Sequence, residues 1–302
     1  MSGLVSDLGS ARLVNGQLLT RFDADYGAFW YYMDPKPRPC FTPGLLAEIA
    51  NSQRLVDQVN RTAFEQEIDC PVPYTILASR SPGVYSMGGD LDLFRKLIAE
   101  RDREGLRHYA KSCIDVIYKM SHNHHLPMTT ISLVQGDALG GGFEGALCCS
   151  VIVAERRARF GLPEVLFNLF PGMGAYSFLS RRIGPARAER LLKSGTLFPA
   201  AELHEMGVVD VLAEDGDGEK SVYEFIAQHR RRSNAYHAIF KVRQRVHDVP
   251  YEELADISEI WVDTALSIGQ KDIRIMERLV KAQDKMRGEA AVAGGMQERG
   301  GL

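Results

Sequence analysis

The sequence predicts an α/β fold in which parallel strands are joined by helical crossovers, followed by a helical C-terminal region. Strand-like and helical segments alternate through about residue 212, and the connections between the strand-like runs are too long for hairpins. From about Gly218 onward the strand signals stop, and apolar residues recur at helical spacing from Leu254 to Val280. We therefore expect a core over residues 1–215, a helical region over 216–286 and a disordered, glycine-rich tail over 287–302.

Composition limits the classes of partner. The chain has 302 residues, 45% of them hydrophobic, and a formal net charge of -3, so it can bury a large core but has no basic field for nucleic acid or an anionic membrane. It lacks an apolar stretch of the ~20 residues that cross a bilayer, and its start lacks a secretory signal pattern, so we expect a cytoplasmic protein. The five cysteines have no metal-site spacing, and we expect reduced thiols, no metal and no cofactor.

The first expected elements follow from local signals. Asn15-Gly16 lies between two apolar stretches and favours a tight hairpin turn. An aromatic strand is expected over 28–34, and Thr42 can cap a helix whose first residue is Pro43.

The next elements complete the alternation. A strand is expected over 74–79, and residues 91–120 read as helix with one interruption around Gly105. Two short β-branched runs then predict strands over 130–136 and 150–156.

Two glycine runs stand at expected junctions from strand to helix. Gly140–Gly142 precede a helix that begins near Glu144, and Gly88 and Gly89 precede the helix at residue 91. Backbone N–H groups point outward at such junctions, and residues without side chains let a developing oxyanion approach them. A tight strand-to-helix turn without any ligand is the alternative interpretation.

A second carboxylate strengthens the chemical interpretation. Glu164 follows a proline within an apolar stretch, where burial favours the neutral acid and raises the pKa of the carboxyl group. Glu144 and Glu164 would then suit acid and base work, whereas a purely structural Glu164 would be a first-turn acid that interacts with a helix dipole.

These segments resemble the crotonase (enoyl-CoA hydratase/isomerase) superfamily. The resemblance covers about residues 70–215 and rests on the strings "GDALGGGFEGAL", "FGLPEVLFNLFPGMGA" and "RRIGPARAERLLKSGTLFPAAELHEMGVVDVL". It implies a spiral of ββα repeats and a C-terminal helical region that serves as lid and for assembly into homotrimers or hexamers. It also implies that Glu144 and Glu164 are the acid/base pair and that Gly88, Gly89 and Gly141 form the oxyanion hole.

A narrower resemblance covers about residues 20–285. "MGGDLDLF", "SLVQGDALGGGFE", "GLPEVLFNLFPGMGAYSF" and "EIWVDTAL" are similar to segments of the bacterial diffusible signal factor synthases. Members of that family dehydrate a 3-hydroxyacyl chain on acyl carrier protein to a cis-2-enoyl thioester, then hydrolyse it to a free fatty acid used in quorum sensing. Some also bind a sensor histidine kinase.

The sequence is compatible with both steps at one site. No G-x-S-x-G elbow offers a separate thioesterase nucleophile, so the two glutamates would serve dehydration and hydrolysis. Crotonases that use CoA commonly carry a phosphate-binding lysine where this chain has Asp92, which favours a carrier protein over acyl-CoA, although Arg80 or Arg95 could replace that lysine.

An acyl pocket is expected beside the glutamates. The resemblance implies that Met173 and Trp261 line it, and Leu139, Phe170 and Gly174 lie in or near the matching segments. Plain core packing is the alternative for these residues.

Two polar segments are assigned no chemistry. Residues 121–127 contain three histidines without a matching carboxylate or cysteine pair, so we expect a solvated loop. The basic run over 229–237 is expected to form a solvent-exposed helix face that could attract an acidic carrier protein.

The sequence thus predicts an enzyme that makes a cis-2-unsaturated fatty acid signal by dehydration and thioester hydrolysis. An ordinary enoyl-CoA hydratase is the nearest alternative, and a non-catalytic binder and regulator of a sensor kinase is the alternative from another class.

Overall fold

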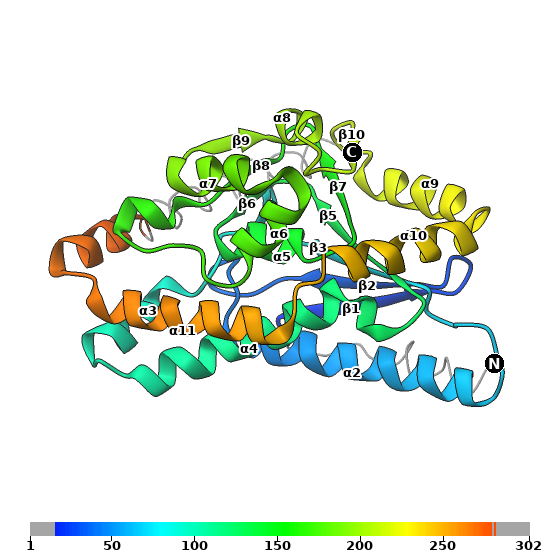
Figure 1. Ribbon diagram of the computed structural model, residues 1–302, viewed down its shortest axis with the longest axis horizontal. Helices are drawn as coiled ribbons and strands as arrows, with labels where there is room; N and C mark the ends of the chain where they lie inside the picture. Colours follow the sequence, from blue (N-terminus) through cyan, green and yellow to red (C-terminus); the bar gives the residue numbers. More distant parts are fainter. Residues whose placement is uncertain (1–15, 280, 282–302) are drawn as a thin grey trace, which may run out of the picture.

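A six-stranded sheet forms the centre of the computed structural model, which describes residues 16–279 and 281 (Figure 1). Its spatial order is β1-β2-β3-β5-β7-β10, with β1 antiparallel to β2 and the other neighbours parallel. The strands are β1 (Leu18–Asp23), β2 (Ala28–Met33), β3 (Tyr74–Ser79), β5 (Thr129–Val134), β7 (Val151–Glu155) and β10 (Val211–Ala213). The predicted parallel strands are confirmed.

A second, four-stranded sheet runs in the order β4-β6-β8-β9. Its strands are β4 (Val84–Ser86), β6 (Asp137–Leu139), β8 (Arg159–Gly161) and β9 (Leu197–Pro199). β4, β6 and β8 each follow a strand of the large sheet, namely β3, β5 and β7, and each pair is followed by helical structure. This repetition is the expected ββα spiral, and it places the ends of β4, β6 and β8 side by side.

Helices α2 to α8 each bury apolar residues in the main core. They are α2 (Pro43–Glu65), α3 (Leu91–Ala99), α4 (Arg103–Ser121), α5 (Gly141–Leu147), α6 (Ala175–Ile183), α7 (Pro185–Ser194) and α8 (Ala200–Glu205). α2 begins as predicted, because the Thr42 hydroxyl accepts a hydrogen bond from the N–H of Leu45 at 3.1 Å and Pro43 needs no partner.

The helical interruption lies slightly earlier than predicted. Helix α3 ends at Ala99 and α4 starts at Arg103, so Gly105 lies in the first turn of α4. The reason is a cap at Asp102, whose side chain accepts a hydrogen bond from the N–H of Gly105 at 2.9 Å.

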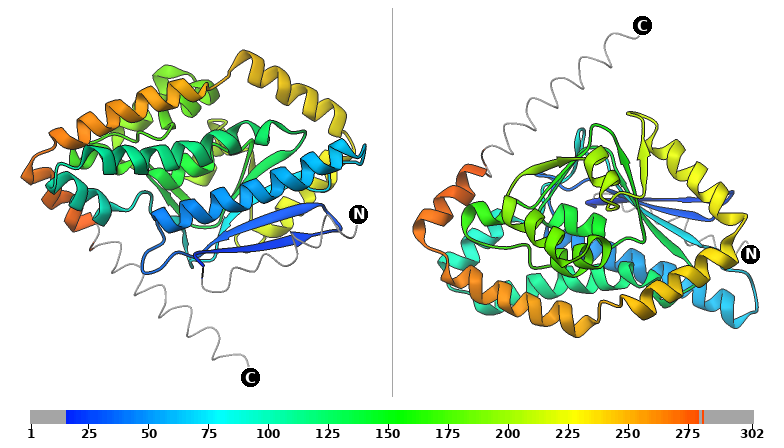
Figure 2. Two further views of the ribbon diagram at one scale, coloured as in Figure 1. Left: turned by 90° about the horizontal axis from the view of Figure 1, so that it is seen from below. Right: turned by 45° about the horizontal axis from the view of Figure 1, so that its top comes forward.

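The C-terminal helices wrap around the core. Helix α9 (Gly218–Arg230) packs on β5, β7 and β10, and α11 (Tyr251–Ser267) packs on α4, which lies between α2 and α11 (Figure 2). Helix α10 (Ser233–Val246) has no buried residue, and residues 270–279 are helical after a break at Ile268 and Gly269. None of the described helices is long and apolar enough to cross a membrane.

One local prediction is wrong: the histidine segment is not a solvated loop, because His122 and His124 are both buried. The first hairpin of the described residues turns at residues 24–27, where Gly27 has a φ of 59°, and Gly16 precedes β1. The predicted turn at Asn15-Gly16 stays a prediction. Asn15, Val280 and the tail over 287–302 lie outside the described residues.

Candidate active site

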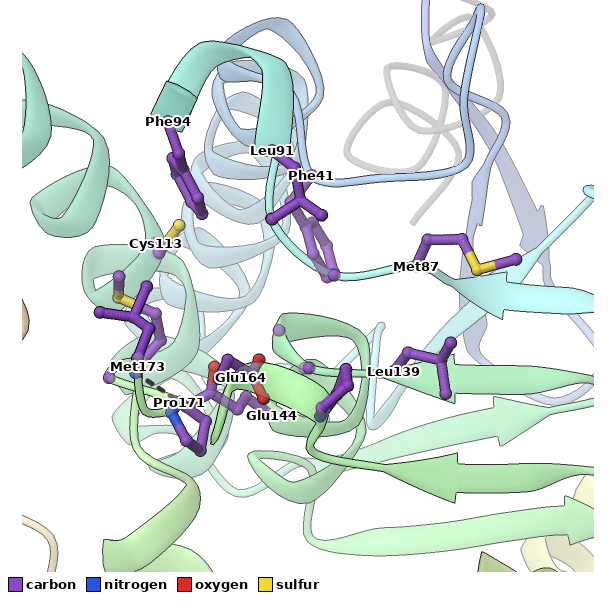
Figure 3. Close-up of a pocket in the computed structure, with 18 of the residues that line it drawn as sticks. Phe41, Met87, Leu91, Phe94, Cys113, Leu139, Glu144, Glu164, Pro171 and Met173 are labelled. Carbon is purple, nitrogen blue, oxygen red and sulfur yellow. Dashed lines mark hydrogen bonds between the residues drawn. The ribbon is translucent and has the colours of Figure 1, made fainter. Parts of the chain in front are cut away.

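An elongated cavity of about 270 Å³ lies between the glycine loops, α2, α4 and α11 (Figure 3). Its lining is predominantly apolar, and Glu144 and Glu164 are the charged residues among the described residues that line it. Figure 3 shows their carboxyl groups near one another on one side of the cavity, with Phe94, Leu91 and Phe41 on the opposite side. The cavity therefore suits an apolar molecule with one polar, reactive end.

Glu144 is held by backbone N–H groups. It lies in α5 and is 2% exposed, and its Oε1 accepts hydrogen bonds from the N–H of Met173 at 2.7 Å and of Ala175 at 3.0 Å. Burial raises the pKa of the carboxyl group to about 7, although these two bonds favour the charged form. Glu144 can therefore gain or lose a proton near neutral pH.

Glu164 has a different environment. It lies in the short 3-10 helix η2 (Pro163–Phe167), and its Oε2 is buried without a hydrogen-bond partner among the described residues. Burial, with a smaller contribution from the charge of Glu144, raises the pKa of Glu164 to about 8. A buried oxygen without a partner is expensive unless a ligand or water meets it, so Oε2 of Glu164 is available for a hydrogen bond with a molecule in the cavity.

The two glycine loops meet beside these carboxyl groups. A Cβ on Gly88 would lie 2.8 Å from the carbonyl oxygen of Leu139 and 3.0 Å from the nitrogen of Gly141. A Cβ on Gly141 would lie 3.3 Å from the nitrogen of Gly89. The N–H groups of Gly89 and Gly141 donate no hydrogen bond to the rest of the described chain. Two free donors thus sit together, as stabilisation of an enolate or tetrahedral oxyanion requires.

Backbone conformation explains the glycines. Gly88 has a φ of 95° and Gly140 a φ of 52°, conformations that residues with side chains rarely adopt. A Cβ on Gly140 would also lie 2.3 Å from Oε1 of Glu164. A glycine at position 140 therefore lets the catalytic candidate Glu164 lie against the loop.

The structure brings most of the predicted acyl residues to the cavity. Leu139, Phe170, Met173 and Trp261 line it, whereas Gly174 does not. Gly174 instead caps α6 with a φ of 115°, and a Cβ there would lie 2.6 Å from the ring of Phe178. Its role is to let the chain turn directly after Met173.

Sequence reasoning missed the other wall of the cavity. It consists of apolar residues on the inner faces of α2 and α4, namely Leu46, Ile49, Tyr109, Cys113, Val116, Ile117 and Met120. Their helical periodicity is visible in the sequence, but it marks a core-facing stripe without showing which part of that stripe faces a cavity.

The charged residues near the cavity are paired with one another. Asp92, which stands where a CoA-binding lysine would be expected, forms an ion pair with Arg38. Arg95 lies 3.8 Å from Glu277. Because the charge of Asp92 is neutralised by Arg38, Asp92 repels a phosphate less than the sequence suggested. The presence of Asp92 therefore discriminates little between CoA and a carrier protein.

The histidine segment is structural. Nδ1 of His124 lies 2.5 Å from Asp57, and Nε2 of His122 lies 2.9 Å from Asp248. The described residues contain no group of three or more His, Cys, Asp or Glu side chains that could hold a metal ion. In the basic run, His229 is buried and bonded to the Tyr74 hydroxyl, whereas the three arginines after it are exposed.

The spiral fold, the glycine loops and the two glutamates that line the cavity together define a crotonase-type site. The family model "Enoyl-CoA hydratase/isomerase" matches residues 50–257. The chain belongs to the enoyl-CoA hydratase/isomerase family, within the crotonase superfamily.

Individual relatives agree at the level of the family. A probable enoyl-CoA hydratase of Mycobacterium leprae is 33% identical over 55% of this chain and 61% of its own length, and one of Rhizobium meliloti is 33% identical over 46% and 54%. The chain thus spans little more than half the length of these curated relatives.

Solved structures share the fold. An enoyl-CoA hydratase of Bacillus halodurans has a TM-score of 0.71 at 20% identity, covering 86% of this chain and 98% of its own. Pseudomonas aeruginosa DspI has a TM-score of 0.66 at 22% identity, covering 84% and 98%.

Proposed function

We propose that this protein dehydrates a long-chain 3-hydroxyacyl thioester carried by acyl carrier protein and then hydrolyses the enoyl thioester, releasing a cis-2-unsaturated fatty acid for quorum sensing. The observation that carries the proposal is the pair of buried carboxyl groups, with pKa values of about 7 and 8, beside the free N–H groups of Gly89 and Gly141. Family membership supports the thioester chemistry.

Dehydration needs one proton removed and one delivered. The thioester oxygen accepts hydrogen bonds from Gly89 and Gly141, which makes the C2 hydrogen acidic and stabilises the enolate. One glutamate takes that proton, and the other protonates the 3-hydroxyl as its C–O bond breaks, so that water leaves and the C2–C3 double bond forms. The pair begins and ends with one shared proton, the state that pKa values of about 7 and 8 favour near neutral pH.

Hydrolysis can use the same groups. A water molecule that gives a proton to the ionised glutamate attacks the carbonyl carbon, and the oxyanion of the tetrahedral intermediate accepts hydrogen bonds from the same two N–H groups. The C–S bond then breaks, the thiol leaves with a proton from the pair, and the free acid is released.

The cavity supports a long apolar chain as the substrate. Helices α2 and α4 line it with apolar residues, and no lysine or arginine is among its described lining residues. The carrier protein is proposed from the resemblance alone, because the pair between Arg38 and Asp92 removes most of the electrostatic argument against CoA.

An ordinary enoyl-CoA hydratase is the second candidate. The names of the curated relatives favour it, since several are called probable enoyl-CoA hydratases. It would use the same glutamates and N–H groups for the first reaction but would leave the C–S bond intact.

Binding to protein partners remains part of the proposal. Helix α10 leaves Tyr236, Ile239, Val242 and Val246 exposed, which supports assembly into homotrimers or hexamers. Sedimentation analysis of the full chain tests this assembly.

A sensor histidine kinase is a further proposed partner. If kinase binding were the protein's only role, that role would survive replacement of both glutamates.

Product analysis tests the proposed reaction. The protein is incubated with 3-hydroxydodecanoyl carrier protein and, separately, with the CoA thioester, and the products are identified by chromatography and mass spectrometry. We expect free cis-2-enoic acid, with Glu144→Gln and Glu164→Gln each lowering the rate by roughly 10²- to 10⁴-fold. A trans-2-enoyl thioester without free acid would instead establish the hydratase, and no product from either thioester would contradict both enzymatic functions.

A further inference from the structure

The segment that holds Glu144 lies flat against a tryptophan from the C-terminal helices. Gly172 immediately precedes Met173, whose N–H, like that of Ala175, donates to Glu144. A Cβ on Gly172 would lie 2.5 Å from Cβ, Cγ and Cδ1 of Trp261 in α11. Trp261 is 3% exposed, so the indole ring is fixed in the core and sets how closely the segment approaches α11.

The same tryptophan reaches the oxyanion loop through a second ring. The ring of Phe94, in α3, meets the ring of Trp261 edge to face at a centroid distance of 5.0 Å. A Cβ on Gly89 would lie 2.6 Å from Cε2 and Cζ of Phe94. The ring of Phe94 therefore lies against the backbone whose N–H is a proposed oxyanion donor.

A third ring fixes the other two. Tyr109, in α4, meets Phe94 edge to face at 4.8 Å. Its hydroxyl donates to the carbonyl oxygen of Phe41 at 2.7 Å and accepts a hydrogen bond from the N–H of Asp90 at 3.4 Å. Tyr109, Phe94 and Trp261 thus form a row of rings, from three helices, that touches both halves of the site.

We propose that Trp261 is a positioning residue that holds the Gly172–Ala175 segment against Glu144 and, through Phe94, fixes the oxyanion loop at Gly89. The inference rests on the proposed function, in which Glu144 transfers protons and Gly89 binds the thioester oxygen. It gives α11 a role in the chemistry itself, besides covering the cavity.

The row of rings formed by Tyr109, Phe94 and Trp261 has a measurable consequence for the pKa of Glu144. The N–H groups of Met173 and Ala175 stabilise the ionised form of Glu144 and oppose the effect of burial on its pKa. Removal of the indole lets this segment move away from the carboxylate. The loss of these two hydrogen bonds raises the pKa of Glu144.

The three rings also line the cavity, so contact with an acyl tail is the rival explanation. The two explanations differ for a short substrate. If Trp261 acts only on the tail, its loss raises KM for long chains and leaves kcat for a 3-hydroxybutyryl thioester unchanged. If it positions Glu144, its loss lowers kcat for both substrates.

The experiment compares Trp261→Ala, Trp261→Phe and Trp30→Ala. Trp261→Phe keeps a flat ring against Gly172. Trp30→Ala removes the chain's other tryptophan, which is fully buried in the separate core between the sheet and α9 and touches no part of the site. Each variant is assayed for kcat and KM against pH with short and long thioesters. The pKa of Glu144 is measured by infrared difference spectroscopy, with the band assigned through Glu144→Gln.

We expect Trp261→Ala to lower kcat about 10²-fold with both substrates and to raise the pKa of Glu144, while Trp261→Phe and Trp30→Ala keep values close to those of the unchanged protein. If Trp261→Ala does not fold, Gly172→Ala makes the same test, because its added Cβ must displace the segment from the indole. An unaltered pKa of Glu144 in the folded variant would overturn the inference, whichever thioester is used. An inactive unchanged protein would count against the proposed function, yet the infrared measurement would still decide the positioning role.

Discussion

Replacement of Glu144 by glutamine should stabilise the folded protein at alkaline pH while it lowers the catalytic rate by roughly 10²- to 10⁴-fold. The folded-state pKa of about 7 lies roughly 2.5 units above the ordinary value of 4.5, and each unit is equivalent to about 1.4 kcal/mol. Because the folded-state pKa is raised, the stability that protonated Glu144 contributes is complete below about pH 4.5 and is lost as the pH rises through about 7. Full ionisation thus costs about 3 kcal/mol, and most of this falls between pH 5 and pH 9.

Glutamine avoids this cost with little change of shape. Its carbonyl oxygen can accept the same hydrogen bonds from Met173 and Ala175. We therefore expect the stability of Glu144→Gln to match that of the unchanged protein near pH 5 and to exceed it by roughly 2 to 3 kcal/mol at pH 9, or by about 5 °C in Tm. Denaturant unfolding at both pH values and a fixed protein concentration measures the difference. A variant that is equally or less stable at pH 9 would refute the assignment of a raised pKa to buried Glu144.

Three further predictions concern activity. The rate should rise with pH through about 7 and fall through about 8, because the pair works with one proton; a flat profile from pH 6 to 9 would argue against a shared proton. Gly140→Ala should inactivate the protein, since its Cβ would lie 2.3 Å from Oε1 of Glu164. Gly184→Ala is the control: Gly184 also has a positive φ, of 83°, but no atom lies within 4 Å of the added Cβ. This variant has the same backbone strain and should stay active in the same assay. Val116→Phe should lower kcat/KM for twelve-carbon relative to six-carbon thioesters by about tenfold or more, and an unchanged ratio would place the acyl tail elsewhere.

Local signals in the sequence were enough for much of the fold. Thr42 and Pro43 act within one helical turn, so the start of α2 could be predicted to the residue. Alternation of strands and helices gave the parallel sheet because parallel strands need long crossovers. The hairpin between β1 and β2 was not predicted, because residues 24–27 contain no Asn-Gly pair and such a pair is only one of several ways to reverse a chain.

The site was predictable where its chemistry depends on residue type. Glycines at strand ends and a glutamate in an apolar stretch can be recognised from the sequence alone as candidate site residues. The structure places Gly88, Gly89 and Gly141 beside one another. Pairings between distant segments were not predictable. The sequence does not show that Asp92 pairs with Arg38, or that His124 is buried against Asp57, because such partners depend on the packing of separate helices.

The central claim is that Glu144 and Glu164 move a proton at C2 of a thioester whose oxygen is held by Gly89 and Gly141. Incorporation of solvent deuterium tests it most directly: a 2-enoyl thioester is hydrated in D₂O, and the label at C2 of the 3-hydroxyacyl thioester is measured by mass spectrometry and NMR. The account predicts one deuterium at C2, on one face only, in the unchanged protein, and incorporation that is slower by roughly 10²- to 10⁴-fold in Glu164→Gln and in Glu144→Gln. Equal incorporation by the protein and by the variant that lacks both glutamates would contradict it.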